Sequence, residues 1–153
     1  MVILGLGSNI GDRQAHLARA CAALAGILRE FRASRVIETP ALLKPGAPAE
    51  WNQAFLNMAV CGETSLAPLA LLSEIKRIER ELGRVDRGHW APREIDIDIL
   101  AMDNVVLQMP ELCIPHKELL NREFALLPLA ELAPDWRWPL AGEYFGKTAQ
   151  DIA

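Results

Sequence analysis

The sequence of 153 residues contains no apolar run long enough to cross a membrane and no cysteine pattern typical of a disulfide framework. A membrane-spanning helix needs about 20 consecutive, mostly apolar residues. The first residues, MVILGLGSNIGDR, lack a basic region followed by a long apolar stretch, so we expect no signal peptide. Cys21, Cys61 and Cys113 are odd in number and far apart, and they form no C-x-x-C metal motif. These absences predict a cytoplasmic protein with reduced cysteines and no membrane partner.

A general excess of positive charge is also missing. The 16 Lys and Arg residues are outnumbered by 20 Asp and Glu residues, which gives a net charge of −4. An acidic chain is a poor general binder of nucleic acid, so we expect no nucleic-acid partner. The segment from Lys76 to Arg93 is an exception, because it holds six basic and three acidic residues. Such a local basic zone suits a small polyanion better than a long one.

The phosphate-binding motif G-x-x-x-x-G-K-[ST] does not occur, so a nucleotide would have to be bound without a P-loop. What is present is typical of a globular protein, since 51% of residues are hydrophobic and 24% are charged. The length fits one domain with a sizeable core. We find no internal repeat, low-complexity segment or linker, and we therefore predict a single domain over residues 1–153.

Hydrophobic patterning predicts alternating strands and helices. Leu17, Cys21, Leu24 and Leu28 fall on one face of a first helix. The clearest helix covers 65–83, with Ser65 as its N-cap, Pro68 in its first turn and Gly83 at its end. Strands are expected at 2–7, 54–62 and 94–102, extended segments at 33–39 and 105–109, loops at 41–53 and 84–92, and short helices within 121–132.

This order, βαββαβ followed by a C-terminal elaboration, predicts an α+β fold of the ferredoxin-like type. In that plan two helices cover one face of an antiparallel sheet. Strand 54–62 would turn Leu56, Met58 and Val60 toward the helices, and Phe55, Asn57 and Ala59 toward the other face. The first strand contributes Gly5 and Gly7 there, whose missing side chains would leave room for a flat ligand.

The strand PREIDIDIL, residues 92–100, places two carboxylates on that same open face. Asp96 and Asp98 alternate with isoleucines, so they lie roughly 7 Å apart along the strand. A solvated strand is one explanation, although neighbouring like charges repel and such faces more often carry Thr, Lys, Arg or Glu. A bound cation is the other. Mg²⁺ takes one or two carboxylates together with phosphate oxygens, and the adjacent basic zone would hold those phosphates, which indicates phosphoryl transfer.

Several motifs together resemble the 6-hydroxymethyl-7,8-dihydropterin pyrophosphokinase family of folate biosynthesis. They occur in the order and spacing of that family and cover nearly the whole chain. APREIDIDIL, with the pattern that begins at IPH and continues through NREF, is the most specific of them. The matching segments are GLGSNIGDR (5–13), FLNMAV (55–60), RIERELGR (77–84), HWAPREIDIDIL (89–100) and IPHKELLNREFALLPLAELAP (114–134).

The resemblance implies transfer of pyrophosphate from ATP to the pterin hydroxymethyl group, with release of AMP. The implied mechanism is Mg²⁺-assisted in-line attack at the β-phosphorus. Asp96 and Asp98 would ligate two Mg²⁺ ions and, with Arg84 and Arg93, form the catalytic set. The implied ATP-binding residues are Glu79, Arg84, Trp90, Arg93, Ile99, His116 and Arg122. The implied pterin-binding residues are Gly7, Thr39, Leu42, Phe55, Asn57, Trp90, Asp96 and Phe124.

The sequence is also compatible with other functions. A non-catalytic ferredoxin-like binding module would share the fold but gives no reason for Asp96, Asp98, Arg84, Arg93 and His116 to coexist. A metal-dependent nuclease or another phosphotransferase could use the carboxylate pair, although a nuclease should be more basic. A related pterin aldolase would not need that pair with arginines. Family members are sometimes fused to a neighbouring folate enzyme, so a fused or adjacent folate-pathway partner is compatible with the resemblance.

Overall fold

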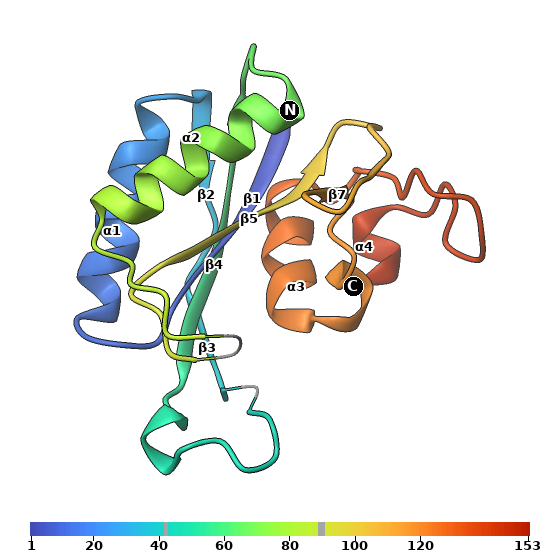
Figure 1. Cartoon of the computed structure of the whole chain (residues 1–153). Coiled ribbons are helices and arrows are strands. Elements are labelled where there is room, and N and C mark those ends of the chain that lie inside the picture. The colour runs from blue at the N-terminus through green and yellow to red at the C-terminus, as the bar shows by residue number, and fades with distance from the viewer. Residues whose placement is uncertain (42, 89–90) are drawn as a thin grey trace.

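An antiparallel sheet lies between two helices on one side and a C-terminal helical segment on the other (Figure 1). The computed structural model describes residues 1–41, 43–88 and 91–153. The strands are β1 (Val2–Ser8), β2 (Arg29–Ala33), β3 (Ile37–Thr39), β4 (Phe55–Glu63), β5 (Asp96–Met102), β6 (Leu107–Gln108) and β7 (Cys113–Ile114). The α-helices are α1 (Arg13–Ala25), α2 (Pro68–Glu81), α3 (Glu123–Leu132) and α4 (Ala149–Ile152), with 3-10 turns at Ala49–Trp51 and Leu119–Asn121.

The sheet order is β2-β4-β1-β5, and β3 also pairs with β4. Each of these pairings is antiparallel, and β6 and β7 form a separate two-stranded ribbon. The first strand therefore lies in the middle, between β4 and β5. The predicted α+β class with an antiparallel sheet is confirmed, and the strand order is consistent with the ferredoxin-like plan.

The first core lies between the sheet and helices α1 and α2. Alternate residues of the strands, such as Leu4 on β1 and Ile97 on β5, are buried against Leu24 of α1 and Ile75 of α2. This alternation is what a strand with one covered face requires. On β5 it leaves the intervening positions, including Asp96, to face the other side of the sheet.

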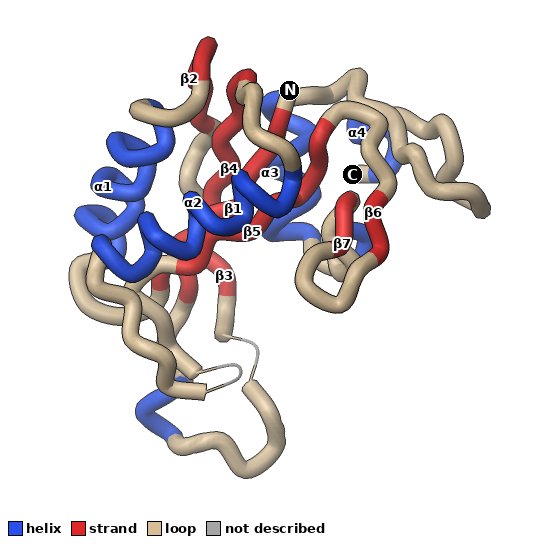
Figure 2. Tube along the Cα trace, turned by 45° about the horizontal axis from the view of Figure 1, so that its top comes forward, coloured by secondary structure: helices blue, strands red, loops and turns tan. Residues whose placement is uncertain are grey.

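A second core occupies half of the opposite face. There α3 and the C-terminal segment pack on Ile3, Ala59 and Cys61, and they bury Leu129 and Trp136 (Figures 1 and 2). The C-terminal elaboration therefore covers one half of the face that sequence reasoning left open. The uncovered half lies toward the end of β1 at Gly7.

Three local predictions need correction. Helix α1 ends at Ala25, and Leu28 lies beyond it, but the Leu28 N–H still bonds to the Leu24 carbonyl at 2.9 Å, so its side chain keeps the helical direction into the core. Helix α2 begins at Pro68 with Ala67 as N-cap, and not at Ser65. The extended segment 33–39 divides into β3 and the end of β2, and 105–109 shortens to β6.

The connections before β4 and before β5 both leave the sheet at the β3 end (Figures 1 and 2). Asn9 ties them together. Its Nδ2 donates to the Gln53 carbonyl at 3.1 Å, and its Oδ1 accepts from the Arg93 N–H at 2.8 Å. Among the described residues, no helix combines the length and apolarity needed to span a membrane.

Candidate active site

The strand register sets the floor of a pocket on the uncovered half of the sheet. On β1, Gly7 pairs with Asn57 of β4 on one side and with Asp96 of β5 on the other. One row further along, Gly5 pairs with Asp98. Because adjacent strands are about 4.8 Å apart, the amide and the carboxylate stand about 10 Å apart across a floor without side chains. A Cβ on Gly7 would come within 3.0 Å of the Asn57 Oδ1, so the floor depends on glycine.

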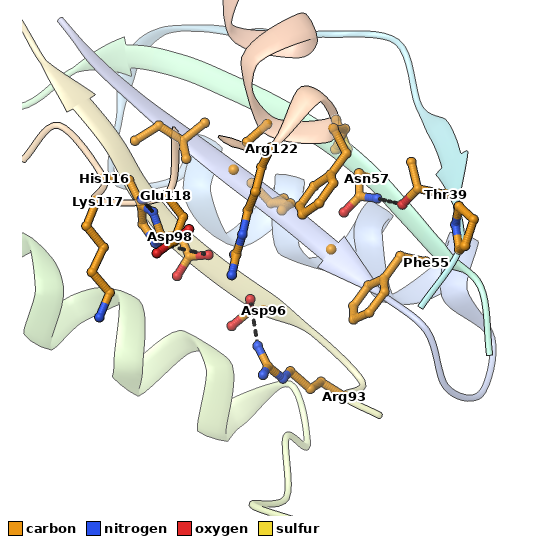
Figure 3. Close-up of a pocket in the computed structure, with 18 residues that line it drawn as sticks. Thr39, Phe55, Asn57, Arg93, Asp96, Asp98, His116, Lys117, Glu118 and Arg122 are labelled. Atoms are coloured by element: carbon orange, nitrogen blue, oxygen red, sulfur yellow. Dashed lines mark hydrogen bonds and ion pairs between the residues drawn. The ribbon is translucent and has the colours of Figure 1, made fainter. Parts of the chain in front are cut away.

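The pocket has a volume of about 310 Å³ and opens above this floor (Figure 3). Ten of the predicted catalytic and binding residues line it, although they come from five distant parts of the chain. They are Gly7, Thr39, Phe55, Asn57, Arg93, Asp96, Asp98, His116, Arg122 and Phe124. Leu42 and Trp90, which were also predicted to bind substrate, lie outside the described residues. The structure thus brings most of the predicted set into one cavity.

Asp96 is held between two arginines. Its Oδ2 lies 3.0 Å from the Arg93 Nη1, and its Oδ1 lies 3.1 Å from the Arg84 Nη1 (Figure 3 shows the first pair). Arg84 is not one of the residues that line the pocket, and it approaches Asp96 from the α2 side. Nearby carboxylates raise the pKa of Arg84 against the opposing effect of its desolvation, so the guanidinium stays charged. A cation placed on Asp96 would compete with both arginines.

Glu79 lies behind this network instead of lining the pocket. Its side chain is 3% exposed. Its Oε2 accepts hydrogen bonds from the Arg84 Nη1 at 2.6 Å and from the Ile97 N–H at 2.8 Å. One buried carboxylate thereby joins α2 to the β5 backbone between the two aspartates. Ile99, another residue in the predicted ATP set, is buried in the core beneath α2, so only its backbone is available near the site.

Asp98 and His116 form the other end of the charged half. Burial, followed by repulsion from Asp96 and Glu79, raises the pKa of Asp98 to about 7. The Asp98 side chain is 37% exposed, but its exposed surface faces the pocket. The surrounding protein therefore still desolvates the carboxylate. Asp98 is therefore harder to ionise than an ordinary aspartate.

The His116 ring has a defined orientation. Its Nδ1 accepts from the Glu118 N–H at 3.1 Å, which leaves Nε2 as the protonated nitrogen, 3.9 Å from the Asp98 Oδ2. Burial and then the positive charge of Arg122 lower the pKa of His116. The neutral imidazole therefore presents an N–H donor to the pocket.

The other half of the pocket is apolar with one amide. Phe55 and Phe124 line it, and the Arg122 guanidinium carbon lies 5.7 Å from the centroid of the Phe124 ring. The Asn57 Nδ2 donates to the Thr39 Oγ1 at 2.6 Å (Figure 3). Two aromatic side chains beside a buried amide suit a flat ring that carries polar atoms on one edge.

Several residues of this region were not predicted from the sequence, among them Lys117 and Asn9. Lys117 lines the pocket beside His116, and the residue pattern gave no signal for it apart from its position next to the histidine. Asn9 was not among the predicted site residues. It nevertheless fixes both hydrogen-bonding groups of the Arg93 backbone, because its Oδ1 accepts from the Arg93 N–H and its own N–H donates to the Arg93 carbonyl at 3.1 Å. Its position in GLGSNIGDR was the available signal.

The carboxylate pair fits a hard cation that shares its coordination with phosphate. Asp96 and Asp98 project from alternate positions of β5 into the same pocket. Within residues 1–41, 43–88 and 91–153, no three His, Cys, Asp or Glu side chains gather into a protein-only metal site. Mg²⁺ is usually bound by only one or two carboxylates plus water and phosphate oxygens, so this donor set suits it.

Comparison with known proteins agrees with this geometry. Residues 3–134 match the family described as 7,8-dihydro-6-hydroxymethylpterin-pyrophosphokinase (HPPK). The chain belongs to the HPPK family. The 2-amino-4-hydroxy-6-hydroxymethyldihydropteridine pyrophosphokinase of Aquifex aeolicus is 41% identical over 139 residues, which cover 91% of this chain and 84% of that relative. The corresponding Bacillus subtilis protein is 39% identical over 84% of this chain and 75% of its own length.

Longer HPPK relatives also match. The folate synthesis bifunctional protein of Chlamydia trachomatis is 44% identical over 99% of this chain, and the chain spans only 35% of that relative. The solved structure of an HPPK-DHPS in complex with substrates has a TM-score of 0.67 at 15% identity, over 99% of this chain and 42% of the other. Plasmodium falciparum HPPK-DHPS with SDX-DHP gives 0.65 at 18% identity, with the same coverage. The structural likeness shows the fold.

Proposed function

We propose that this protein transfers pyrophosphate from ATP to the hydroxymethyl group of 6-hydroxymethyl-7,8-dihydropterin and releases AMP. The observation that carries the proposal is the row Asn57–Gly7–Asp96, which places an amide-and-aromatic pocket next to a carboxylate flanked by arginines. A flat pterin on the glycine floor would direct its hydroxymethyl group toward the charged half. Membership of the HPPK family supports the same reaction.

The charged half would bind the triphosphate. Asp96 and Asp98 would hold Mg²⁺ ions, which when bound neutralise phosphate charge and assist in-line attack at the β-phosphorus. Arg93 already lies against Asp96, so it is placed to exchange that carboxylate for a phosphate oxygen. Arg122 and His116, which also line the pocket, would donate hydrogen bonds to the phosphates. These residues supply positive charge and fixed donors where negative charge is redistributed during transfer.

The apolar half would bind the pterin. Phe55 and Phe124 would stack on the ring, and the Asn57 side chain would form hydrogen bonds with the amide edge of the ring. Arg84 would hold Asp96 in position through their ion pair. Glu79 would hold Arg84 and the β5 backbone at Ile97 in position through its hydrogen bonds. The roles suggested for Leu42, Trp90 and the Ile99 backbone in substrate binding also belong to this proposal.

We treat residues 1–153 as one catalytic unit. Because the chain matches about a third of the Chlamydia bifunctional protein, a second folate enzyme joined to it or acting beside it is a compatible partner. In such an arrangement, the pyrophosphorylated pterin would pass to an enzyme that displaces pyrophosphate.

The experiment that tests the proposal measures AMP formed from ATP with each component omitted in turn. We expect AMP only when the pterin alcohol and Mg²⁺ are both present. A binding module without catalysis would form no AMP at all. ADP as the product, or AMP formed equally well without pterin, would contradict the proposal.

A further inference from the structure

We propose that Glu94 is a positioning residue that keeps Arg84 and Arg93 together at the charged half of the pocket. Glu94 directly follows Arg93, and its side chain binds the chain directly after Arg84. The inference rests on the proposed function, because it concerns the two arginines that flank Asp96. Glu94 is not among the residues that line the pocket, so it acts through the arginines and not on the substrates.

The Glu94 carboxylate makes three contacts across the segment between the two arginines. Its Oε1 accepts from the Val85 N–H at 3.2 Å, and the Arg87 Nη1 donates to its Oε1 at 2.6 Å and to its Oε2 at 2.5 Å. The same Arg87 nitrogen also donates to the Val85 carbonyl at 3.3 Å. Val85, Arg87 and Glu94 therefore form one closed cluster, which we call the Glu94 clamp.

The clamp is partly sheltered from water, above all at its acidic end. The Glu94 side chain is 13% exposed, and the Arg87 side chain is 34% exposed. Fully exposed ion pairs contribute little because solvent and salt screen them, whereas partly buried pairs are screened less. The backbone N–H of Val85 adds a contact that carries no net charge. The clamp is therefore better suited to hold a fixed geometry than an ordinary surface pair.

Each arginine also has anchors of its own, and these lie on different parts of the fold. The Arg84 N–H donates to the Glu79 carbonyl at 3.1 Å, and its Nη1 donates to the Glu79 Oε2 at 2.6 Å, so Arg84 is held from α2. The Arg93 backbone is held by Asn9, the residue after β1. The contact that the two arginines share is Asp96. The clamp is a second link between these two parts of the fold.

This second link becomes important once Asp96 changes partners. If Arg93 exchanges Asp96 for a phosphate oxygen, as proposed above, the link through Asp96 is lost, while Glu94 keeps its bonds to Val85 and Arg87. Arg93 then stays next to the neighbouring arginine and has less conformational freedom to lose on binding phosphate. Donors that are already in place lower the barrier, because little reorganisation is needed in the transition state.

The test compares the steady-state kinetics of AMP formation in wild type, Glu94→Ala and Glu94→Gln. We expect Glu94→Ala to lower kcat about tenfold and to leave the KM for the pterin within about twofold, because the clamp lies outside the ring half of the pocket. Glu94→Gln keeps an oxygen that can accept from the Val85 N–H, so its kcat should fall only about threefold. The kcat values are calculated per folded molecule, with the folded fraction taken from circular dichroism.

Amide hydrogen exchange gives a second measurement that needs no substrate. The Val85 N–H, followed by NMR, should exchange faster in Glu94→Ala than in wild type, because its acceptor has been removed. In Glu94→Gln its exchange should stay close to that of wild type. This measurement reports on the clamp itself, whatever reaction the protein catalyses.

Two further substitutions separate the clamp from the mere loss of a charge. Asp86→Ala is the matched control, because Asp86 lies in the same segment but its Oδ1 accepts from the nearby Gly88 N–H, and kcat should stay within about twofold. Arg87→Met removes the other charged partner and should lower kcat about threefold, which also tests the clamp if Glu94→Ala does not fold. Added to Glu94→Ala, Arg87→Met should cost less than about twofold more.

The outcomes are distinguishable. Near-normal kcat in Glu94→Ala, unchanged Val85 exchange in that variant, or an equal loss of kcat in Asp86→Ala would each overturn the inference. So would a full additional loss from Arg87→Met in the Glu94→Ala background. A wild-type protein that forms no AMP would instead reject the proposed function, and the inference with it.

Discussion

Glu79 allows the sharpest prediction about stability. It is buried at 3% exposure, yet it accepts hydrogen bonds from the Arg84 guanidinium and from the Ile97 N–H. Glu79→Ala would orphan that backbone N–H and remove one partner of a buried ion pair, which together cost about 3–5 kcal/mol in comparable sites. In this variant Arg84 would still pair with Asp96, and its side chain is 25% exposed. We therefore expect the free energy of unfolding to fall by an amount at the lower end of this range, about 3 kcal/mol.

The assay is urea unfolding together with thermal unfolding. For a chain of this size about 3 kcal/mol corresponds to a drop in Tm of roughly 6–12 °C. Glu79→Gln should be less destabilising, because its amide oxygen can still accept from Ile97. Glu81→Ala is the matched control. Glu81 has a side chain that is 64% exposed, and among the described residues it pairs only with Arg77 on the same helix, so its loss should change stability by less than about 0.5 kcal/mol. A Glu79→Ala protein within 1 kcal/mol of wild type would refute the reasoning.

Two further predictions concern the pocket, and a third concerns the ion pair between Arg35 and Glu131 of α3. Asp96→Asn and Asp98→Asn should each lower AMP formation by about 10²-fold or more while leaving the circular dichroism spectrum intact, and near-normal turnover in either would remove it from the catalytic set. Gly7→Ala should weaken pterin binding by about tenfold in a fluorescence titration and leave ATP binding unchanged, because its Cβ would meet the Asn57 Oδ1 at 3.0 Å. Hydrogen bonds from the Arg35 side chain and backbone lower the pKa of Glu131 below its ordinary 4.5. These bonds therefore add to the free energy of unfolding at neutral pH, and this contribution is lost as the pH falls through the lowered pKa. Glu131→Gln should therefore be slightly less stable than wild type at pH 7, by under about 1 kcal/mol, and equal to it at pH 2; a difference that persisted in acid would contradict this assignment.

Much of the fold could be predicted from periodicity because the core strands turn alternate apolar residues toward α1 and α2. The alternation in 95–99 correctly separated buried Ile97 from Asp96 on the pocket side. The edge strand β2 was missed because its side chains are mostly exposed and charged, as in REFRA, so it carries little apolar signal. The β-bulge between β1 and β5 was also not predictable, since it depends on pairing between distant segments.

The position of α3 shows another limit of sequence reasoning. The sequence predicted short helices within 121–132, but not the face of the sheet against which Leu126, Leu129 and Leu132 are buried. The candidate site residues were predicted through motifs. The contacts that orient them were not predicted, because those of Asn57 with Thr39 and of Asn9 with Arg93 join segments whose register is set only in the folded chain.

The most direct test of the central claim is to identify what leaves ATP and where it goes. Mass spectrometry and phosphorus NMR of a reaction with 6-hydroxymethyl-7,8-dihydropterin, ATP and Mg²⁺ would show both products. We expect AMP and a pterin that has gained two phosphate groups as one unit, with the γ-phosphate of ATP still attached to the β-phosphate. A pterin bearing a single phosphate together with ADP, or free pyrophosphate with unmodified pterin, would contradict attack at the β-phosphorus by the hydroxymethyl oxygen.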